Sequence, residues 1–261
     1  MSDVACAARP REGHNPHMDV RWMWIFVDAL APAGPAWDFW QAATRSARSA
    51  TRGDHDEFAT LTPAQGDPWV KVQEVRSGGG IHLDLDVPDP LAAAEDVVAA
   101  GAGEVFRYAD GGCVILRSPG GFVFCLTRWD GAAAQARAGE PDLLDQLCLD
   151  IPAASYEVEC AFWGRFLGAD PVRGSLPEFR AVPRVSHLPV RILLQRKDSG
   201  DGPVTGHVDF ACADRQATRR AHEGVGAAYR GSGPHWTVMR APGGQTYCLT
   251  DRDPETGTLR A

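Results

Sequence analysis

The sequence lacks the features that mark several large classes of protein. It contains no run of about 18 apolar residues that could form a transmembrane helix, and its first twenty residues include no apolar segment typical of a signal peptide. A P-loop and the Gly-x-Ser-x-Gly motif of many serine hydrolases are also missing. We therefore expect a cytoplasmic protein that uses neither a phosphate-binding loop nor a serine nucleophile of that kind.

Positive charge is scarce as well. The 261 residues include 26 basic and 34 acidic side chains, a formal net charge of −8, and only two of the basic residues are lysines, Lys71 and Lys197. Nucleic acids and acidic membranes are bound through basic surfaces, so neither is an expected partner. We expect a small-molecule ligand, and a chain that is a monomer or a homodimer.

Cysteine is present, but not in a pattern typical of disulfide-bonded proteins. Seven cysteines, an odd number, are scattered along the chain without a Cys-x-x-Cys pair. A disulfide framework needs densely spaced, paired cysteines in a small secreted chain. We therefore expect reduced thiols, which agrees with a cytoplasmic location.

An internal repeat determines the domain organisation. Short motifs recur in the same order at offsets of 121 to 125 residues, which indicates a tandem duplication. We place the two domains at 20–128 and 143–252, with a linker at 129–142 and terminal tails at 1–19 and 253–261. The matched motifs are Phe39-Trp40 with Phe162-Trp163, Glu57-Phe58 with Glu178-Phe179, Gln73 with Gln195, His82-Leu-Asp84 with His207-Val-Asp209, Pro119-Gly-Gly121 with Pro242-Gly-Gly244, and Phe124-Cys-Leu-Thr127 with Tyr247-Cys-Leu-Thr250.

Each domain is predicted to contain a β-α-β-β-β pattern twice. The fold class is therefore α+β, with tandem βαβββ modules that form two curved mixed sheets, each backed by two helices. In the first domain we expect strands at 22–27, 57–61, 69–75, 81–87, 105–108, 113–117 and 122–126, and helices at 35–43 and 91–100. In the second we expect strands at 147–151, 178–182, 190–195, 208–212, 237–240 and 246–249, and helices at 156–166 and 215–223.

Alternation along the strands predicts a polar face in each domain. Successive strand residues point to opposite faces, so the leucines of residues 81–87 pack under the helices while His82, Asp84 and Asp86 share the other face. If the sheet curls, that face lines a cup, and cups are common ligand sites. The predicted lining is Trp24, Lys71, Gln73, His82, Asp84, Asp86 and Cys125 in the first domain and Gln195, His207, Asp209 and Cys248 in the second. The first cup is the better equipped of the two, and the second is partly structural.

These features resemble the vicinal oxygen chelate superfamily, and within it the glyoxalase-like domains, over nearly the whole chain. That superfamily includes glyoxalase I, extradiol dioxygenases, fosfomycin-resistance enzymes and bleomycin-binding proteins. The resemblance is specific for the fold but not for an activity, because this fold carries unrelated chemistries. The segments that carry it are His82-Leu-Asp-Leu-Asp-Val-Pro-Asp89, the helix end at Gly101-Ala102, and Ser118-Pro-Gly-Gly-Phe-Val-Phe-Cys-Leu126.

The resemblance implies where a metal would bind, and this sequence departs from that pattern. Metal-dependent members supply ligands from the first and last strands of paired modules, typically His and Glu. Neither domain has the usual set of two histidines and two carboxylates. The corresponding positions hold Trp24, Gln73, His82 and Cys125 in the first domain, and Leu147 or Cys148, Gln195, His207 and Cys248 in the second.

We therefore predict no resident cofactor, and name His82 and His207 as the candidate ligands if a divalent metal does bind. The only three-ligand set that can be assembled is His82, Asp84 and Cys125, although two residues along a strand span roughly 6–7 Å, which is awkward for one ion. The same three residues are the catalytic candidates, with the Cys125 thiol activated by His82. Equally consistent with the sequence are a buried His82 bonded to Gln73 or Asp84, and a Cys125 packed as a small apolar residue.

We predict that the chain binds a small organic molecule in a cup-shaped pocket, in drug sequestration or natural-product metabolism. The alternative is a divalent-metal-dependent lyase, isomerase or dioxygenase of the vicinal oxygen chelate superfamily. A third hypothesis is a scaffold whose cups are closed by side chains. Whether the protein is an enzyme is left open by its sequence.

Overall fold

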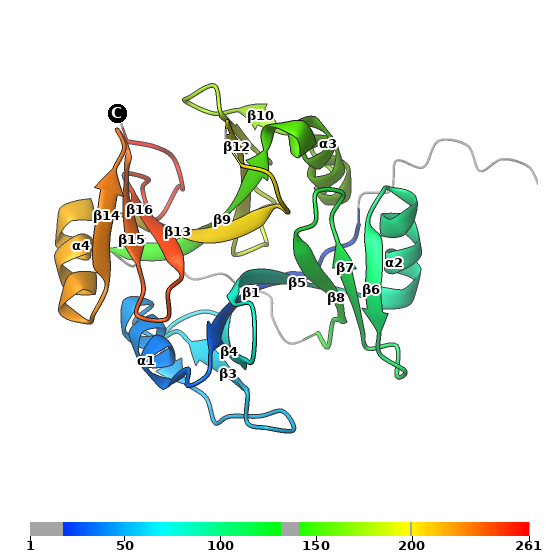
Figure 1. The fold of residues 1–261 in the computed structure, drawn as a ribbon, viewed down its shortest axis with the longest axis horizontal. Helices are drawn as coiled ribbons and strands as arrows, with labels where there is room; N and C mark the ends of the chain where they lie inside the picture. Colours follow the sequence, from blue (N-terminus) through cyan, green and yellow to red (C-terminus); the bar gives the residue numbers. More distant parts are fainter. Residues whose placement is uncertain (1–17, 132–140, 199, 261) are drawn as a thin grey trace, which may run out of the picture.

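The two halves of the chain fold into two mixed eight-stranded sheets (Figure 1). The computed structural model describes residues 18–131, 141–198 and 200–260. The predicted N-terminal tail lies outside the described residues up to position 17, as do most of the predicted linker, at 132–140, and residue 261. Within the described part of the chain, no helix is long and apolar enough to cross a membrane.

The first sheet is built from two βαβββ modules in succession. Its strand order is β2-β3-β4-β1-β5-β8-β7-β6, so the first strands of the two modules, β1 and β5, pair at the centre. The elements are β1 (Trp22–Leu30), α1 (Gly34–Ala43), β2 (Ala47–Arg48), β3 (Phe58–Thr62), β4 (Val70–Val75), β5 (Gly80–Val87), α2 (Pro90–Ala99), β6 (Gly103–Arg107), β7 (Cys113–Arg117) and β8 (Val123–Arg128).

The second sheet repeats this topology in the order β10-β11-β12-β9-β13-β16-β15-β14. The α+β fold with tandem βαβββ modules is therefore confirmed. Its elements are β9 (Asp142–Pro152), the short 3-10 turn η1 (Ala153–Ser155), α3 (Tyr156–Leu167), β10 (Val172–Arg173), β11 (Phe179–Ala181), β12 (Arg191–Lys197), β13 (Thr205–Cys212), α4 (Arg215–Gly224), β14 (Ala228–Ser232), β15 (Trp236–Arg240) and β16 (Thr246–Thr250).

The first helix of each half packs against the sheet of the other half. On α1, the rings of Phe39 and Trp40 lie 5.7 and 5.4 Å from the ring of Tyr247 on β16. On α3, the ring of Trp163 lies 5.5 Å from that of Phe124 on β8. Figure 1 shows this exchange, with α1 beside β15 and β16 and α3 beside β7 and β8. The expectation that each sheet is backed by its own two helices is therefore corrected, and the two halves share one hydrophobic core.

The duplicated Pro-Gly-Gly motifs are turns at this shared core. A Cβ atom added at Gly120 would lie 2.6 Å from Cγ2 of Val204, and one added at Gly243 would lie 2.6 Å from Cβ of Ala36. The second glycine of each turn has a positive φ, +96° and +88°, which favours glycine. Both turns therefore need glycine, for close approach to the other half and for backbone conformation.

The C-terminal residues are ordered against the second sheet and do not form the expected tail. Arg252 and Leu259 form a β-bridge, and Arg260 donates a hydrogen bond of 2.6 Å to the backbone oxygen of Ala213. This segment contributes Gly257, Thr258 and Leu259 to the rim of a cavity in the second sheet. It therefore belongs to the second domain and helps to close its cup.

Candidate functional site

The residues predicted to share a face are neighbours in both sheets. The strand that carries the histidine, β5 or β13, lies between the first strand of its half and the last. His82 lies opposite Phe26 on β1, and His207 lies opposite Cys148 on β9. On the other side, Asp84 lies beside Cys125 on β8, and Asp209 lies beside Cys248 on β16. The first-strand residue opposite the histidine, where the resemblance implies a ligand, is thus Cys148 in the second half. In the first half it is Phe26 rather than Trp24.

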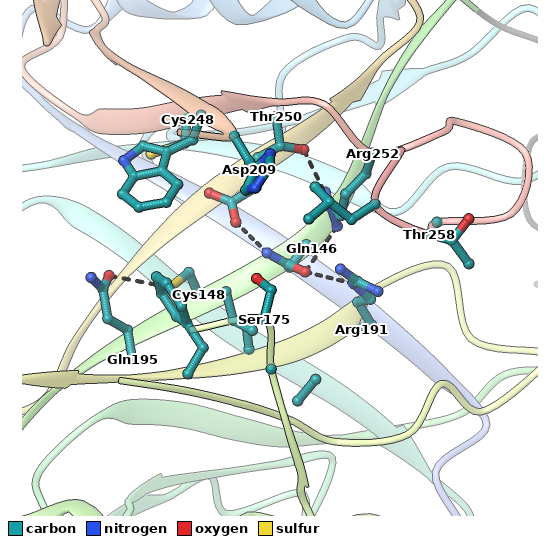
Figure 2. Close-up of a pocket in the computed structure, with 18 of the residues that line it drawn as sticks. Gln146, Cys148, Ser175, Arg191, Gln195, Asp209, Cys248, Thr250, Arg252 and Thr258 are labelled. Carbon is teal, nitrogen blue, oxygen red and sulfur yellow. Dashed lines mark hydrogen bonds between the residues drawn. The ribbon is translucent and has the colours of Figure 1, made fainter. Parts of the chain in front are cut away.

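The second cup contains a cavity of about 340 Å³ (Figure 2). All four residues predicted to line this cup, including His207 and Asp209, line the cavity. The sequence interpretation missed further lining residues, which add two guanidinium groups, an amide, a hydroxyl and an aromatic wall to the site. These are Gln146, Phe179, Arg191, Trp236, Thr250 and Arg252.

His207 is held with one ring nitrogen toward the cavity. Its Nδ1 lies 2.7 Å from Oδ2 of Asp150, and its Nε2 lies 3.4 Å from Oδ1 of Asp209. Burial lowers the pKa of His207, but its interactions with Cys148 and Asp150 outweigh burial, so the pKa is raised well above its ordinary value. Pairing of a carboxylate with one imidazole nitrogen fixes the ring and directs the other nitrogen into the site, where an ion could replace its proton.

Two thiols flank His207. Burial raises the pKa of Cys148 to about 12, and burial also raises the pKa of Cys248. The Cys148 thiol donates a long hydrogen bond of 3.8 Å to Oε1 of Gln195. Both thiols are therefore protonated at neutral pH unless a cation replaces the proton.

The other end of the cavity is positively charged. Gln146 accepts hydrogen bonds at Oε1 from Arg191 (2.5 Å) and Arg252 (2.8 Å), and donates one from Nε2 to Asp209. Arg252 is paired with the buried Asp145, whereas burial and the neighbouring Arg252 lower the pKa of Arg191 to about 10. Arg191 is still charged at neutral pH, so this end of the cavity favours an anionic group.

The first cup repeats the histidine arrangement. His82 Nδ1 lies 2.6 Å from Oδ2 of Asp28, and His82 Nε2 lies 3.6 Å from Oδ1 of Asp84. The partner of His82 is therefore Asp28 and not Gln73, which lies on β4 at the register position of Asp28. The separation of 6–7 Å expected between His82 and Asp84 is also wrong for their functional atoms, because the side chains converge on the cup.

Cys125 does not have the properties of an activated nucleophile. Its hydrogen bond to Cys113, burial and the nearby Asp84 all raise its pKa far above the ordinary value. A thiol needs a depressed pKa to supply a thiolate near neutral pH. The candidate pair of Cys125 and His82 is therefore unsuited to nucleophilic catalysis.

The first cup differs from the second in a group built around Lys71. Its ammonium nitrogen lies 4.0 Å from the ring centroid of Trp24, and the indole nitrogen of Trp24 donates a 2.8 Å hydrogen bond to Asp86. These three residues line a cavity of about 300 Å³. The register places Leu193 at the second-half position that corresponds to Lys71. The first cup thus carries an amine beside its carboxylates, whereas the second carries two guanidinium groups and the additional thiol of Cys148.

The orienting carboxylates could have been found in the sequence. Asp28 and Asp150 are separated by 122 residues, within the range of offsets that relates the other repeated motifs. They lie on the first strand of each half, where alternation also places them on the cup face. The repeat therefore contained the signal. It was missed because the residues on either side of Asp28 differ from those on either side of Asp150, so no longer repeated motif marks them.

The second cup fits a divalent cation. One ligand atom each of Cys148, His207 and Asp209 lies within 4.8 Å of the other two. Oδ1 of Asp209 is buried and is without a hydrogen-bond partner among the described residues. Sulfur, imidazole nitrogen and carboxylate oxygen together suit zinc. His82, Asp84 and Cys125 form a comparable cluster, in which Lys71 interacts with Asp84 as Arg252 interacts with Asp209 in the second cup. The second cluster lines the cavity of about 340 Å³.

Comparison with known proteins identifies the class and then the family. The topology is that of the vicinal oxygen chelate superfamily, and the model of the glyoxalase-like domain matches residues 24–127 and 146–250. The chain belongs to the glyoxalase-like domain family, with two copies of the domain. No curated protein matches it.

Solved structures with this fold include several enzymes. A mutant of 4-hydroxymandelate synthase from Streptomyces coelicolor is 14% identical, with a TM-score of 0.63 over 94% of this chain and 95% of that one. The dioxygenase LapB from Pseudomonas sp. KL28 is 14% identical, with a TM-score of 0.61 over 94% and 96%. The Mn(II)-bound glyoxalase from Novosphingobium aromaticivorans is 16% identical, with a TM-score of 0.60 over 92% and 85%. At these identities the likeness shows the fold alone.

The sequence-based prediction that the chain has no resident cofactor is wrong. It rested on the missing His and Glu ligands, yet a protein of this fold binds Mn(II), and the second cup gathers a different set of ligand atoms. The sequence interpretation considered only one three-ligand set, His82, Asp84 and Cys125, and did not place Cys148 opposite His207. A metal site is therefore consistent with both the fold and the residues present.

Proposed function

We propose that the chain is a divalent-metal-dependent enzyme that acts on a small organic anion in the second cup. The observation that carries this proposal is the cluster of Cys148, His207 and Asp209 on the wall of a 340 Å³ cavity whose other end holds Arg191 and Arg252. A ligand that bridges these two ends needs an anionic group and a second oxygen a short distance away.

The residues of the cavity divide into those that hold the substrate and those that hold the ion. Arg191 would pair with a carboxylate of the substrate, since Arg252 is already paired with the buried Asp145. Phe179 and Trp236, whose rings are 5.9 Å apart, provide an apolar wall against which a flat or hydrophobic group can pack. The substrate class is therefore a small carboxylate with a planar or apolar body.

The ligand set favours reactions without a change in oxidation state. Zinc is the ion that best suits this mixed set of sulfur, nitrogen and oxygen, and an ion held there would polarise a substrate oxygen as a Lewis acid. Asp150 holds the His207 ring with Nε2 toward the site, and Gln146 holds Asp209. We therefore favour a lyase or an isomerase over a dioxygenase.

Cobalt(II) titration tests the ion site directly, because cobalt bound to a thiolate gives a charge-transfer absorption band. We expect saturation at one equivalent in the full chain, loss of binding in His207→Ala, and loss of the charge-transfer band in Cys148→Ser. The matched controls His82→Ala and Cys125→Ser alter the first cup and should leave the band intact. An unaltered band in Cys148→Ser would remove the basis of the proposal.

Sequestration of a ligand without turnover is the second candidate, and the aromatic wall favours it. Trp236 lines the cavity, so a ligand packed there would change its fluorescence. Saturable quenching by small aromatic carboxylates that are recovered unchanged, in protein without metal, would support sequestration over catalysis. Consumption of the ligand only when metal is present would support the enzyme.

A further inference from the structure

We propose that the first cup is a second reactive site, in which the amine of Lys71 captures a small, flat aldehyde or ketone as an imine. The site is separate from the metal-binding cluster of the second cup, and it does not depend on the function proposed above. It consists of Lys71, Trp24, Asp86 and Thr127, which line a cavity of about 300 Å³ together with Pro68 and the charged residues Asp67, Arg128 and Asp130.

The amine is placed where an organic molecule can reach it. Lys71 rises from β4, and its Nζ lies 4.0 Å from the ring centroid of Trp24 and 5.0 Å from that of Phe26. The amine lies over one face of the Trp24 ring, so a planar carbonyl compound that packs against this ring brings its carbonyl carbon close to the nitrogen. Burial also lowers the pKa of Lys71, which increases the fraction of neutral, nucleophilic amine.

A carboxyl group is held in the same cavity. Oδ1 of Asp86 accepts a hydrogen bond of 2.6 Å from the Thr127 hydroxyl, and Oδ2 accepts one of 2.8 Å from the Trp24 indole. A carboxyl group held in this way can exchange protons with a reacting group in the cavity. The group therefore has the position and the chemistry of an acid–base partner for Lys71.

The reaction balances without a co-reactant. The neutral amine adds to the carbonyl carbon and forms a carbinolamine, whose hydroxyl receives a proton from Asp86 and leaves as water. The nitrogen lone pair forms the carbon–nitrogen double bond, and Asp86 recovers the proton that the nitrogen releases. One amine and one carbonyl compound thus give one imine and one water.

The duplicated half shows that the fold does not require these residues. The register places Leu193, Gln146 and Ala211 at the positions of Lys71, Trp24 and Asp86 in the second cup. The second sheet has the same strand order with none of the three. Partial burial of an amine has an unfavourable desolvation free energy, so the presence of Lys71 in one cup alone points to a role other than folding.

The composition of the chain makes the test unambiguous. Lys71 and Lys197 are the only lysines, and the Lys197 side chain is 47% exposed near Asp150. The full chain is incubated at pH 7 with benzaldehyde and sodium cyanoborohydride, which reduces an imine to a stable benzylamine, and the modified lysines are identified by peptide mass spectrometry. We expect Lys71 to be trapped several-fold faster than Lys197, because the Lys71 amine lies in a cavity beside an aromatic surface.

Control variants separate the site from its surroundings. Asp86→Asn should slow trapping at Lys71 and change its pH profile while leaving Lys197 unchanged, and Lys71→Arg should leave Lys197 as the only modified lysine. His207→Ala removes the metal site of the second cup and should not affect trapping, so failure of one proposal is distinguishable from failure of the other. Equal or slower modification of Lys71, or the same Lys71 rate in Asp86→Asn, would overturn the proposal.

Discussion

Replacing Asp150 by asparagine is expected to weaken metal binding in the second cup while leaving the fold intact. Asp150 lies 2.7 Å from Nδ1 of His207 and fixes the ring so that Nε2 faces Cys148 and Asp209. Loss of such an orienting group typically lowers metal affinity by about 10- to 100-fold. Asparagine keeps an oxygen that can accept the hydrogen bond and loses only the charge, so we expect about tenfold weaker binding, or about 1.4 kcal/mol.

Asp150→Ala removes both the charge and the acceptor, and its effect should approach the upper limit of about 100-fold. Both affinities can be measured by competition for zinc against a chromophoric chelator. The matched control is Asp28→Asn, which removes the corresponding charge beside His82 in the first cup and should leave zinc affinity unchanged. Unchanged affinity in Asp150→Ala would refute the argument that Asp150 positions a metal ligand.

Three further results are expected from other parts of the structure. Burial lowers the pKa of His222 to about 4 in the folded protein. Between about pH 6.5 and 4 the unfolded chain therefore binds a proton on this side chain that the folded chain does not bind. The free energy of unfolding should fall by about 3 kcal/mol as the pH is lowered through this window. Urea denaturation of His222→Gln should show a smaller loss of unfolding free energy between pH 7 and pH 4 than the unaltered protein shows. An identical loss in the two proteins would contradict this. Gly243→Ala should destabilise the protein by about 1–3 kcal/mol because the new Cβ would lie 2.6 Å from Cβ of Ala36, whereas Gly34→Ala, with open space around it, should be tolerated. Arg191→Met should weaken calorimetric binding of benzoate about tenfold through loss of a charged hydrogen bond, and unchanged binding would place the anion elsewhere.

The repeat and the strand alternation were sufficient to predict the topology. A constant offset between motifs is a property of the whole chain, and alternation follows from strand geometry, so neither depends on details of packing. The same reasoning missed the exchange of helices, because the buried faces of α1 and α3 look alike whichever sheet they cover. Phe39 and Trp163 show that both helices serve the opposite half.

The candidate site was predictable as a face but not as a set of contacts. Alternation placed His207 and Asp209 together, but the register across the sheet decides which first-strand residue completes the group, and a shift of two residues is invisible in the sequence. The register replaces Trp24 by Phe26 in the first cup and selects Cys148 in the second. Contacts made by segments that are distant in the sequence can be known only from the folded structure. Arg252, which follows the last strand, makes such a contact.

The metal content of the full chain, purified without a polyhistidine tag, tests the central claim most directly. The claim is that the two similar cups have diverged, so that only the second, with Cys148 in place of Phe26 and Leu193 in place of Lys71, holds a divalent ion. Elemental analysis is expected to find one equivalent, lost in His207→Ala and retained in His82→Ala. An ion that is lost in His82→Ala and retained in His207→Ala would contradict the account.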